Sequence, residues 1–366
     1  MDAIEIENDM EVSARGLRNQ NVKIDFAMNK ILLHPEQFKA IREGDISAAP
    51  ISIELSLTNS CNIDCVWCVD VDWRGNHKGT IDPDFLLPAL EEFRDMGTKG
   101  VVVEGGGEPT VHPRFREIVE GILDLGLSVG LITNGTYFKD FDLVPHFEWI
   151  RVSLDASTRE EYLEAKKKDL FDKLLDNVGK MADAAKGHDT IIGIGYLIST
   201  LSITDVPGIA KKCKDLGVDY FQMRRLTEHE EYALPKNYHL SEVEALSDSS
   251  FTVHAHQMED ATDTERGNLG LPCVAHQLSS VICQDGSIFF CCRLHALELP
   301  SGKHMGVIGN IYDQSVAEIW GGKRRRLMAE KMLLPSECQK HCPECRMTKY
   351  NLLVHELRQT KSKNFI

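Results

Sequence analysis

Apolar and polar residues follow a regular rhythm between about residue 51 and residue 226. Ile51, Ile53, Leu55 and Leu57 alternate with polar residues, which is the period of a β-strand. Further strands are predicted at Gly100–Glu104, Ser128–Thr133, Trp149–Leu154, Ile191–Ile198 and Asp219–Arg224. Helical spacing of apolar residues predicts helices over 84–96, 113–125, 159–167, 170–185 and 206–216. Six strands alternating with helices indicate an α/β fold with a parallel sheet.

The rhythm is absent on both sides of this region, and this suggests the domain organisation. The predicted units are an N-terminal lead-in (1–49), the α/β core (50–226), a linker (227–270), a cysteine-rich unit (271–350) and a helical tail (351–366). Within the cysteine-rich unit, Ser279–Ile282 and Ser287–Phe290 flank a turn with Gly286 and predict a β-hairpin. The segment Val316–Met332 predicts a helix.

Charge and hydropathy narrow the possible partners. The formal net charge is -15, so the chain presents no evident field for nucleic-acid phosphates, and we expect no nucleic-acid partner. No apolar run approaches the roughly 20 residues that a membrane helix needs, so we expect a cytoplasmic protein without membrane contact. In a reducing compartment, the 11 cysteines are expected to be metal ligands or free thiols rather than disulfides.

A compact group of cysteines directly follows the first predicted strand. Cys61, Cys65 and Cys68 are separated by three and two residues. Loops at the carboxyl ends of parallel strands commonly form active sites. A [4Fe–4S] cluster normally takes four thiolates, so three would leave one iron open to another ligand. The alternatives are three buried thiols, or a zinc site completed by His77.

The CxxxCxxC spacing, with aromatic Trp67 before the last cysteine, resembles the radical S-adenosylmethionine superfamily. The resemblance implies a partial (β/α)6 TIM-like barrel with a [4Fe–4S] cluster on Cys61, Cys65 and Cys68. It also implies that S-adenosylmethionine binds the open iron. Reductive cleavage, with electrons from a flavodoxin or ferredoxin, would then give a 5′-deoxyadenosyl radical that abstracts hydrogen from a substrate.

Three further motifs lie at the ends of predicted strands and strengthen the resemblance. Gly105-Gly106-Gly107-Glu108-Pro109 resembles the family's GGEP motif, Thr133-Asn134-Gly135 its TNG, and Arg151–Ala156 its VSLDA. In the family, the GGEP motif binds the cofactor's amino group. For Arg224, or alternatively Arg225, the implied partner is the cofactor carboxylate. The residues implied to bind the cofactor are Trp67, Gly106, Gly107, Glu108, Asn134, Ser153, Asp155 and Arg224.

A second group of cysteines near the C-terminus resembles a SPASM extension. Twelve residues separate Cys273 from Gly286, and four more precede Cys291. Cys342 and Cys345 form a later CxxC, and no cysteine follows. This matches the shortened "twitch" version, which implies one auxiliary [4Fe–4S] cluster on these four cysteines. Alternative ligands, hydrogen donors or inert thiols are Cys283, Cys292 and Cys338.

The family context leaves several reactions open. We expect a small polar substrate resembling a sugar, aminocyclitol or nucleotide sugar, with oxidation or epimerisation as the outcome. About 50 residues precede the first strand, which is short for the leader-binding domain of many peptide-modifying relatives. Peptide modification stays the alternative, and a zinc-ribbon scaffold on a degenerate barrel is the alternative of another class. Substrate contacts are also conceivable for Asp70, Asp72, Trp73 and Arg74, which follow the first cysteine group.

Overall fold

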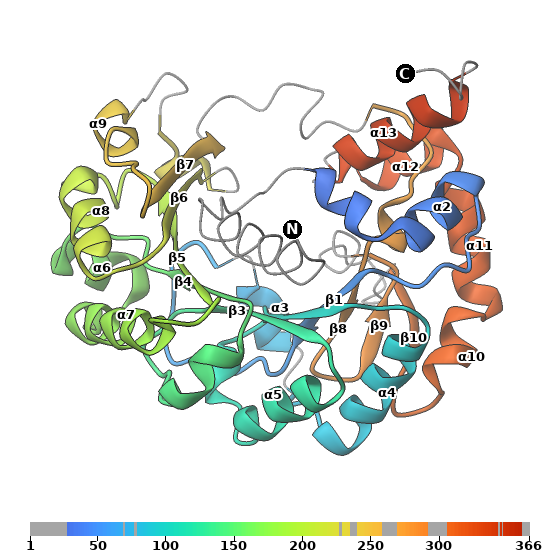
Figure 1. The fold of residues 1–366 in the computed structure, drawn as a ribbon, viewed down its shortest axis with the longest axis horizontal. Coiled ribbons are helices and arrows are strands. Elements are labelled where there is room, and N and C mark those ends of the chain that lie inside the picture. Colours follow the sequence, from blue (N-terminus) through green and yellow to red (C-terminus); the bar gives the residue numbers. More distant parts are fainter. Residues whose placement is uncertain are drawn as a thin grey trace, which may run out of the picture.

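The computed structural model contains one curved β-sheet with helices on its outer side (Figure 1). It describes residues 28–68, 70–76, 79–226, 229–234, 240–257, 269–291, 306–342, 345 and 347–360. Within these residues the strand order is β10-β9-β8-β1-β2-β3-β4-β5-β6-β7. The strands are β1 Ser52–Ser56, β2 Gly100–Glu104, β3 Ser128–Thr133, β4 Trp149–Ser153, β5 Ile191–Ile198, β6 Tyr220–Arg225, β7 Thr252–Gln257, β8 Ser279–Ile282, β9 Ser287–Phe289 and β10 Val307–Asn310.

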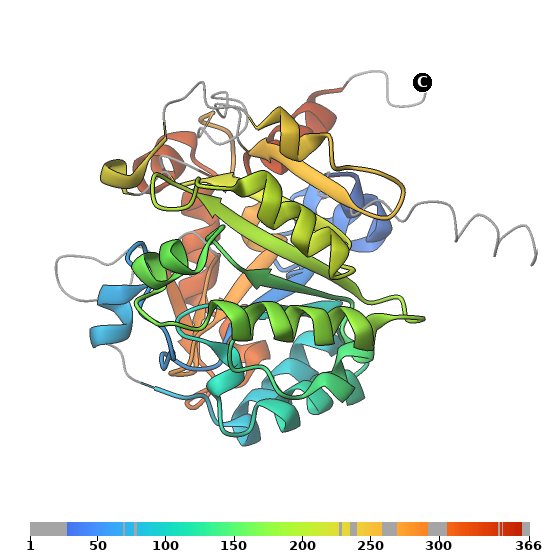
Figure 2. The same ribbon diagram turned by 90° about the vertical axis from the view of Figure 1, so that its left-hand side faces the viewer.

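Strands β1 to β7 are parallel to their neighbours, and helices connect them across the outer face (Figures 1 and 2). The connecting helices are α4 Pro83–Asp95, α5 Phe115–Asp124, α6 Arg159–Lys166, α7 Phe171–Ala185 and α8 Val206–Asp215. Local sequence sets their starts. The Asp82 side chain accepts a hydrogen bond from the amide of Asp84, and Thr158 and Glu161 form a capping box. No helix in the described segments is long and apolar enough to cross a bilayer.

The two faces of the sheet differ in polarity. Successive side chains of a strand point to opposite faces. In β1, Ile53 and Leu55 belong to the core that packs under the helices, while Glu54 points the other way. The same alternation gives the inner face its polar residues, namely Glu54, Glu104, Arg151, Ser153, Gln222 and Arg224. The inner face therefore combines these polar side chains with apolar ones such as Val102, Ile132 and Leu197, while the side chains on the opposite face pack in the core under the helices.

The C-terminal region continues the same sheet. The predicted hairpin is present as β8 and β9, and β8 also pairs in parallel with β1, with Ser52 opposite Ser279. The remaining helices are α2 Pro35–Glu43, α3 Val71–Asn76, α9 Ser241–Glu244, α10 Val316–Trp320, α11 Lys323–Met332, α12 Pro335–His341 and α13 Thr348–Gln359, with short 3-10 turns such as η2 Pro109–Val111. The cysteine-rich region is thus joined to the barrel through backbone hydrogen bonds.

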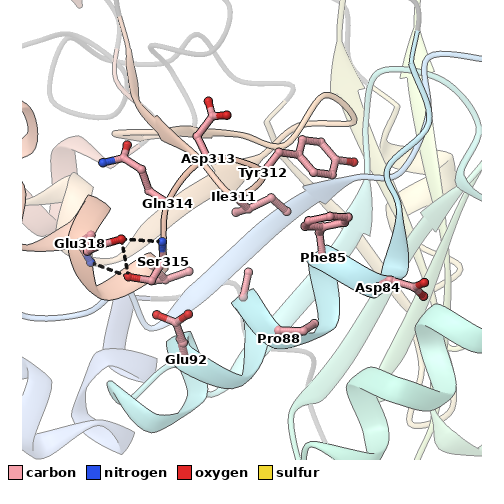
Figure 3. Close-up of a pocket in the computed structure, with 12 residues that line it drawn as sticks. Asp84, Phe85, Pro88, Glu92, Ile311, Tyr312, Asp313, Gln314, Ser315 and Glu318 are labelled. Carbon is pink, nitrogen blue, oxygen red and sulfur yellow. Dashed lines mark hydrogen bonds between the residues drawn. The ribbon is translucent and has the colours of Figure 1, made fainter.

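Side chains of α4 and the C-terminal region also meet at the surface (Figure 3). The Tyr312 hydroxyl accepts a hydrogen bond from the amide of Asp82 at 3.0 Å, and its ring meets Phe85 edge-to-face. The amide of Ala317 donates to the carboxylate of Glu92 at 3.0 Å. Phe85, Glu92 and Tyr312 border an open pocket of 380 Å³. The contacts fix the C-terminal helices against the barrel.

The structure differs from the sequence predictions in two places. The segment 227–270, expected to be a linker, contains α9 and a seventh parallel strand, β7. Its sequence TVHAHQ has polar residues at alternate positions and lacks the apolar run of the other strands. The predicted helix Val316–Met332 is two helices, α10 and α11, because Gly321-Gly322 interrupts it.

Candidate active site

The first cysteine group lies on the loop that follows β1. Cys61, Cys65 and Cys68 are all half-buried free thiols. The loop is held by the last turn of α6, because the carbonyls of Ala165 and Lys166 accept hydrogen bonds from the amides of Val66 and Asp64. Carbonyls at a helix C-terminus lack partners within the helix. The end of α6 therefore supplies a ready set of acceptors that fixes the cysteine loop.

Burial makes ionisation of these thiols costly without a compensating charge. It raises the pKa of Cys61 to about 11, and it also raises the pKa of Cys65. Two cations reduce this cost. Arg74 donates a hydrogen bond to the sulfur of Cys68 at 3.5 Å, and Lys166 favours the Cys65 thiolate through its charge and a hydrogen bond. A bound metal would add a larger positive charge and favour the thiolates further.

Lys166 belongs to a buried ion pair beside this loop, and the sequence analysis did not identify it. Its Nζ lies 2.5 Å from the carboxylate of Asp155, and the two side chains are 2% and 8% exposed. The other carboxylate oxygen of Asp155 accepts a hydrogen bond from the amide of Leu197 at 2.6 Å. The Lys166 ammonium also lies 5.7 Å from the ring centre of Trp67. A lysine four residues after buried Tyr162 on the same helix face was the available signal.

The glycine motif after β2 packs directly on the cysteine loop. The amides of Gly107 and Glu108 donate hydrogen bonds to the carbonyls of Thr58 and Ser60 at 2.8 and 2.9 Å. A Cβ atom on Gly107 would overlap the Ser60 carbonyl. Gly106 has φ of 61°, in the left-handed region that favours glycine. The motif therefore needs glycine for close approach of the two loops, independently of any ligand.

Glu108 is completely enclosed, and its carboxylate already accepts four hydrogen bonds. The donors are the amide and hydroxyl of Thr110, the hydroxyl of Thr133 and the amide of Asn134, at 2.6 to 3.1 Å. Burial raises the pKa of Glu108, while these donors oppose the shift. The side chain thus connects the loop after β2 to the loop after β3. Its expected contact with the cofactor's amino group stays a prediction.

Asn134 joins the third loop to the cysteine loop. Its side-chain amide donates to Asn62 at 2.9 Å, and Asn62 in turn donates to the Thr136 hydroxyl at 2.7 Å. The same Asn134 amide nitrogen lies 4.0 Å from the sulfur of Cys61. Asn134 therefore orders the turn and contacts a cysteine sulfur at once.

The other residues expected to bind the cofactor lie along the same edge of the sheet. Ser153, at the end of β4, is half-buried on the inner face. Asp155 follows it with φ of 52° and is engaged with Lys166. Arg224 lies near the end of β6 on the inner face. The structure thus gathers the residues predicted from the four motifs at the carboxyl ends of β1 to β6.

The C-terminal region contains a second group of buried cysteines, in which Cys291, Cys338 and Cys345 lie near Cys273. Cys273, Cys291, Cys342 and Cys345 were predicted ligands, and Cys338 joins them. A hydrogen bond with Cys338 and burial raise the pKa of Cys273 well above its usual value, and the nearby Cys291 and Cys345 raise it further. Helix α12 therefore brings a further buried thiol, Cys338, to the predicted ligands.

The other two alternative cysteines do not join this group within the described residues. Cys283 is buried in a separate apolar cluster that includes Val281 and Phe289. Cys292 lies outside the described residues, as does His77, the suggested fourth zinc ligand. Among the residues that the structure describes, no three Cys, His, Asp or Glu side chains close around one point as single-ion ligands.

Comparison with known families now identifies the chain. Residues 55–201 match the Radical SAM superfamily, and residues 273–346 match the SPASM iron–sulfur cluster-binding domain. The chain is a radical S-adenosylmethionine enzyme with a SPASM domain. The two matches coincide with the two cysteine groups, one at the mouth of the barrel and one in the C-terminal region.

Two kinds of curated relatives resemble this radical enzyme. The "tungsten-containing aldehyde ferredoxin oxidoreductase cofactor-modifying protein" of Pyrococcus furiosus is 24% identical over 318 residues, covering 80% of this chain and 86% of that protein. A "probable GTP 3′,8-cyclase" of Methanocaldococcus jannaschii is 26% identical over 174 residues, covering 45% of this chain and 56% of that protein.

Solved structures support the fold. Streptococcus suis SuiB bound to the precursor peptide SuiA superposes with a TM-score of 0.60 at 14% identity, covering 89% of this chain and 78% of that one. Native anSMEcpe with bound AdoMet gives 0.55 at 15% identity, covering 84% and 95%. At this level of identity the likeness establishes the partial barrel with its C-terminal extension, and nothing about the substrate.

The cofactors of this radical enzyme are a [4Fe–4S] cluster that binds S-adenosylmethionine, S-adenosylmethionine itself, and an auxiliary iron–sulfur cluster. The residues fit them. The loop after β1 offers three accessible thiols beside cationic Arg74 and Lys166, and the C-terminal region offers a buried thiol group. Turnover also needs an electron donor and a substrate.

Proposed function

We propose that the enzyme oxidises a small polar substrate after hydrogen abstraction. Cys61, Cys65 and Cys68 would hold the radical-generating cluster, and the C-terminal thiols would hold the electron-accepting one. The observation that carries this proposal is that Cys273, Cys291, Cys338 and Cys345 are buried close together, in a region whose strand β8 pairs with β1. A rigid connection of this kind suits an acceptor that must receive an electron from the barrel.

When bound, the cluster and S-adenosylmethionine supply a carbon radical that abstracts hydrogen. The chain's own residues prepare the site for it. Arg74 and Lys166 compensate the thiolate charge, and Gly107 lets the loop after β2 approach the cysteine loop. The hydrogen bonds of Glu108 and Asn134 hold the loops after β1, β2 and β3 in fixed positions relative to one another. These contacts would orient the cofactor together with Trp67, Gly106, Ser153 and Asp155.

The proposed oxidation needs no oxidant other than the 5′-deoxyadenosyl radical and the auxiliary cluster. A carbon bearing a hydroxyl loses one hydrogen atom to the 5′-deoxyadenosyl radical, which becomes 5′-deoxyadenosine. The substrate radical would then give up one electron, for which an auxiliary cluster held by the C-terminal thiols would be the acceptor, and its hydroxyl proton would go to solvent, which would leave a ketone. The external electron donor, for which a flavodoxin or ferredoxin is suited, supplies the electron that cleaves S-adenosylmethionine.

Two observations favour a small polar substrate over a peptide. The inner face of the sheet carries charged and amide side chains, including Glu104, Arg151 and Gln222, which suit hydrogen bonding to a hydrophilic molecule. One curated relative is named as a GTP 3′,8-cyclase and another as a cofactor-modifying protein, and neither name refers to a peptide. The similarity to SuiB concerns the fold, so peptide modification is an outcome for the experiment to test.

Metal analysis after anaerobic reconstitution tests the two cluster sites. The native chain should bind about eight irons and eight sulfides, and the Cys61/Cys65/Cys68 triple alanine variant about four of each. Cys213→Ala, which removes a buried thiol on α8, is the matched control and should bind the native amount. About four irons with zinc in the native chain would make the C-terminal region a structural ribbon and refute the acceptor mechanism.

Product analysis tests the reaction class. With a panel of polyols, aminocyclitols and nucleotide sugars, oxidation should give a product two mass units lighter and one 5′-deoxyadenosine per product. A product of unchanged mass in H2O that becomes one mass unit heavier when turnover takes place in D2O would indicate epimerisation instead. Turnover of peptides alone, with no small-molecule product, would contradict the proposed substrate class.

A further inference from the structure

Two arginines face the interior of the barrel from alternate strands. Arg151 lies on β4 and Arg224 on β6, and both are on the inner face. β5 runs between them, with glycine at positions 193 and 195. The side chain of Arg151 lies against Gly195, where a Cβ atom would come within 3.4 Å of its Cδ. Gly193 leaves room for the Tyr220 ring and Gly195 for the Arg151 side chain, while Leu197 is the β5 residue opposite Arg224.

Both guanidinium groups have buried atoms without hydrogen-bond partners. The Nε of Arg151 and the Nε of Arg224 are each inaccessible to solvent and unpaired. The only hydrogen bond from the Arg151 guanidinium to another described residue is a long one, 3.4 Å, to the Gln222 side chain. Burial lowers the pKa of Arg224, and the charge of Arg151 lowers it further. The two guanidinium groups are therefore close enough to repel each other, in a part of the barrel interior that is poorly hydrated.

Nearby carboxylates offset the positive charge of Arg224 without restoring its usual pKa. Asp155 and Glu104 are close enough to influence Arg224. Asp155, however, is already paired with Lys166 and the amide of Leu197. Two buried guanidinium groups with unused donors are unfavourable unless an anion accepts from them. A planar guanidinium binds carboxylate and phosphate oxygens in a two-point geometry, which makes these the best-fitting partners.

We propose that Arg151 and Arg224 form an anion site inside the barrel that binds a carboxylate or phosphate group of the substrate. This inference rests on the proposed function, because it assigns the substrate to the barrel. Arg151 precedes Ser153 by two residues on the same strand face and so lies about 6–7 Å deeper along β4. Arg224 lies near the end of β6, so the site extends inward from the strand ends where the cofactor contacts gather. The anionic group would anchor the substrate and leave its polar carbon skeleton toward the strand ends.

The experiment uses the reconstituted enzyme in the presence of S-adenosylmethionine. The probes are inorganic phosphate and acetate, and chloride at equal ionic strength is the reference. Calorimetric titration should show binding of at least one probe to the native enzyme. Arg151→Gln and Arg224→Gln should each weaken it about tenfold or more, because a charged hydrogen-bond partner is lost. Arg159→Gln, which removes a guanidinium from a surface ion pair on α6, is the matched control. Equal binding by all four proteins, or none by the native enzyme, would overturn the proposal.

The cofactor carboxylate is the competing source of the anion, since Arg224 was predicted to pair with it. Binding of S-adenosylmethionine and of decarboxylated S-adenosylmethionine separates the two. If the pair serves the substrate, Arg224→Gln should change the affinity for both by the same factor. A loss confined to the carboxylated cofactor, together with competition between phosphate and S-adenosylmethionine, would assign the pair to the cofactor and refute the substrate site.

Two further measurements keep the result interpretable. Arg151→Lys and Arg224→Lys retain the positive charge and should bind phosphate more tightly than the glutamine variants but less tightly than native enzyme. Iron content and unfolding temperature establish that each variant is folded. Formation of 5′-deoxyadenosine by the dithionite-reduced native enzyme tests the radical function separately, because anion binding needs no turnover.

Discussion

At the scale of single residues, the site depends on side chains that support the motif residues. Asp155 was predicted from its motif, but its partner Lys166 comes from the end of α6. The Glu108 carboxylate is occupied by hydrogen bonds from its own loop and from Thr133 and Asn134 at the end of β3. Motif spacing identifies which residues gather at the strand ends. It does not identify partners such as Lys166, because their proximity depends on how helices and strands pack.

Replacing Lys166 by methionine should destabilise the folded chain and lower the reduction potential of the cluster. The change leaves the Asp155 carboxylate buried without its cation, which costs about 3–5 kcal/mol of unfolding free energy. It also removes a positive charge and a hydrogen bond from the Cys65 sulfur, which favours the oxidised cluster. Denaturant unfolding of the apo chain and an EPR-monitored redox titration of the reconstituted enzyme measure the two effects.

The matched variant is the double change Asp155→Asn with Lys166→Met. It removes both charges, so most of the lost stability should return, while the reduction potential should stay low because Cys65 still lacks its cationic neighbour. If the single and double variants were equally unstable, the ion pair would not be the cause. An unchanged potential in both would show that Lys166 does not influence the cluster.

At the scale of elements, strong apolar periodicity predicted the strands correctly, whereas a strand with weak periodicity was missed. The predicted bounds of Gly100–Glu104, Ser128–Thr133 and Ile191–Ile198 agree with β2, β3 and β5. These strands pack against helices on one side, so the side chains on that side must be apolar to be buried there. β7 went unrecognised because Thr252–Gln257 pairs with only β6 and carries histidines at alternate positions. The parallel pairing of β8 with β1 is a contact across more than 200 residues, which local sequence does not encode.

Helix α12 determines which thiols surround the auxiliary site, and this yields a prediction about ligand choice. Cys338 hydrogen-bonds with Cys273, although the sequence pattern favours Cys342 and Cys345 as the partners of Cys273 and Cys291. We expect Cys338→Ala to keep the full complement of about eight irons, whereas Cys342→Ala should retain the iron with altered spectra because Cys338 replaces the missing ligand.

Iron analysis and EPR of the auxiliary cluster in the Cys61/Cys65/Cys68 triple alanine background measure this directly. The double variant Cys338→Ala with Cys342→Ala should lose the remaining four irons, since only three thiols of the group are left. Loss of iron in Cys338→Ala alone would instead make Cys338 an obligatory ligand. Retention in the double variant would mean that another residue completes the site.

At the scale of the whole molecule, the barrel and the C-terminal region share one sheet and one apolar core. Strand pairing joins β8 to β1, and the core cluster extends from Ile53 to Trp320. Trp320 is buried, meets Phe93 of α4 edge-to-face, and donates a hydrogen bond from its indole to the Ala48 carbonyl at 3.1 Å. The guanidinium of Arg325 lies 3.8 Å from the same ring. The two cofactor regions are therefore expected to unfold as one unit.

Replacing Trp320 by alanine tests this integration. Deleting a buried tryptophan costs about 3–5 kcal/mol of unfolding free energy. In a cooperative molecule the whole unfolding curve should shift to lower denaturant, and tertiary-structure signals from both cysteine regions should move together. Leu334→Ala, which truncates an exposed apolar side chain, is the matched control and should leave the curve nearly unchanged. Two separated transitions, with the barrel retaining native stability, would show instead that the C-terminal region folds independently and that the shared sheet does not couple the two sites.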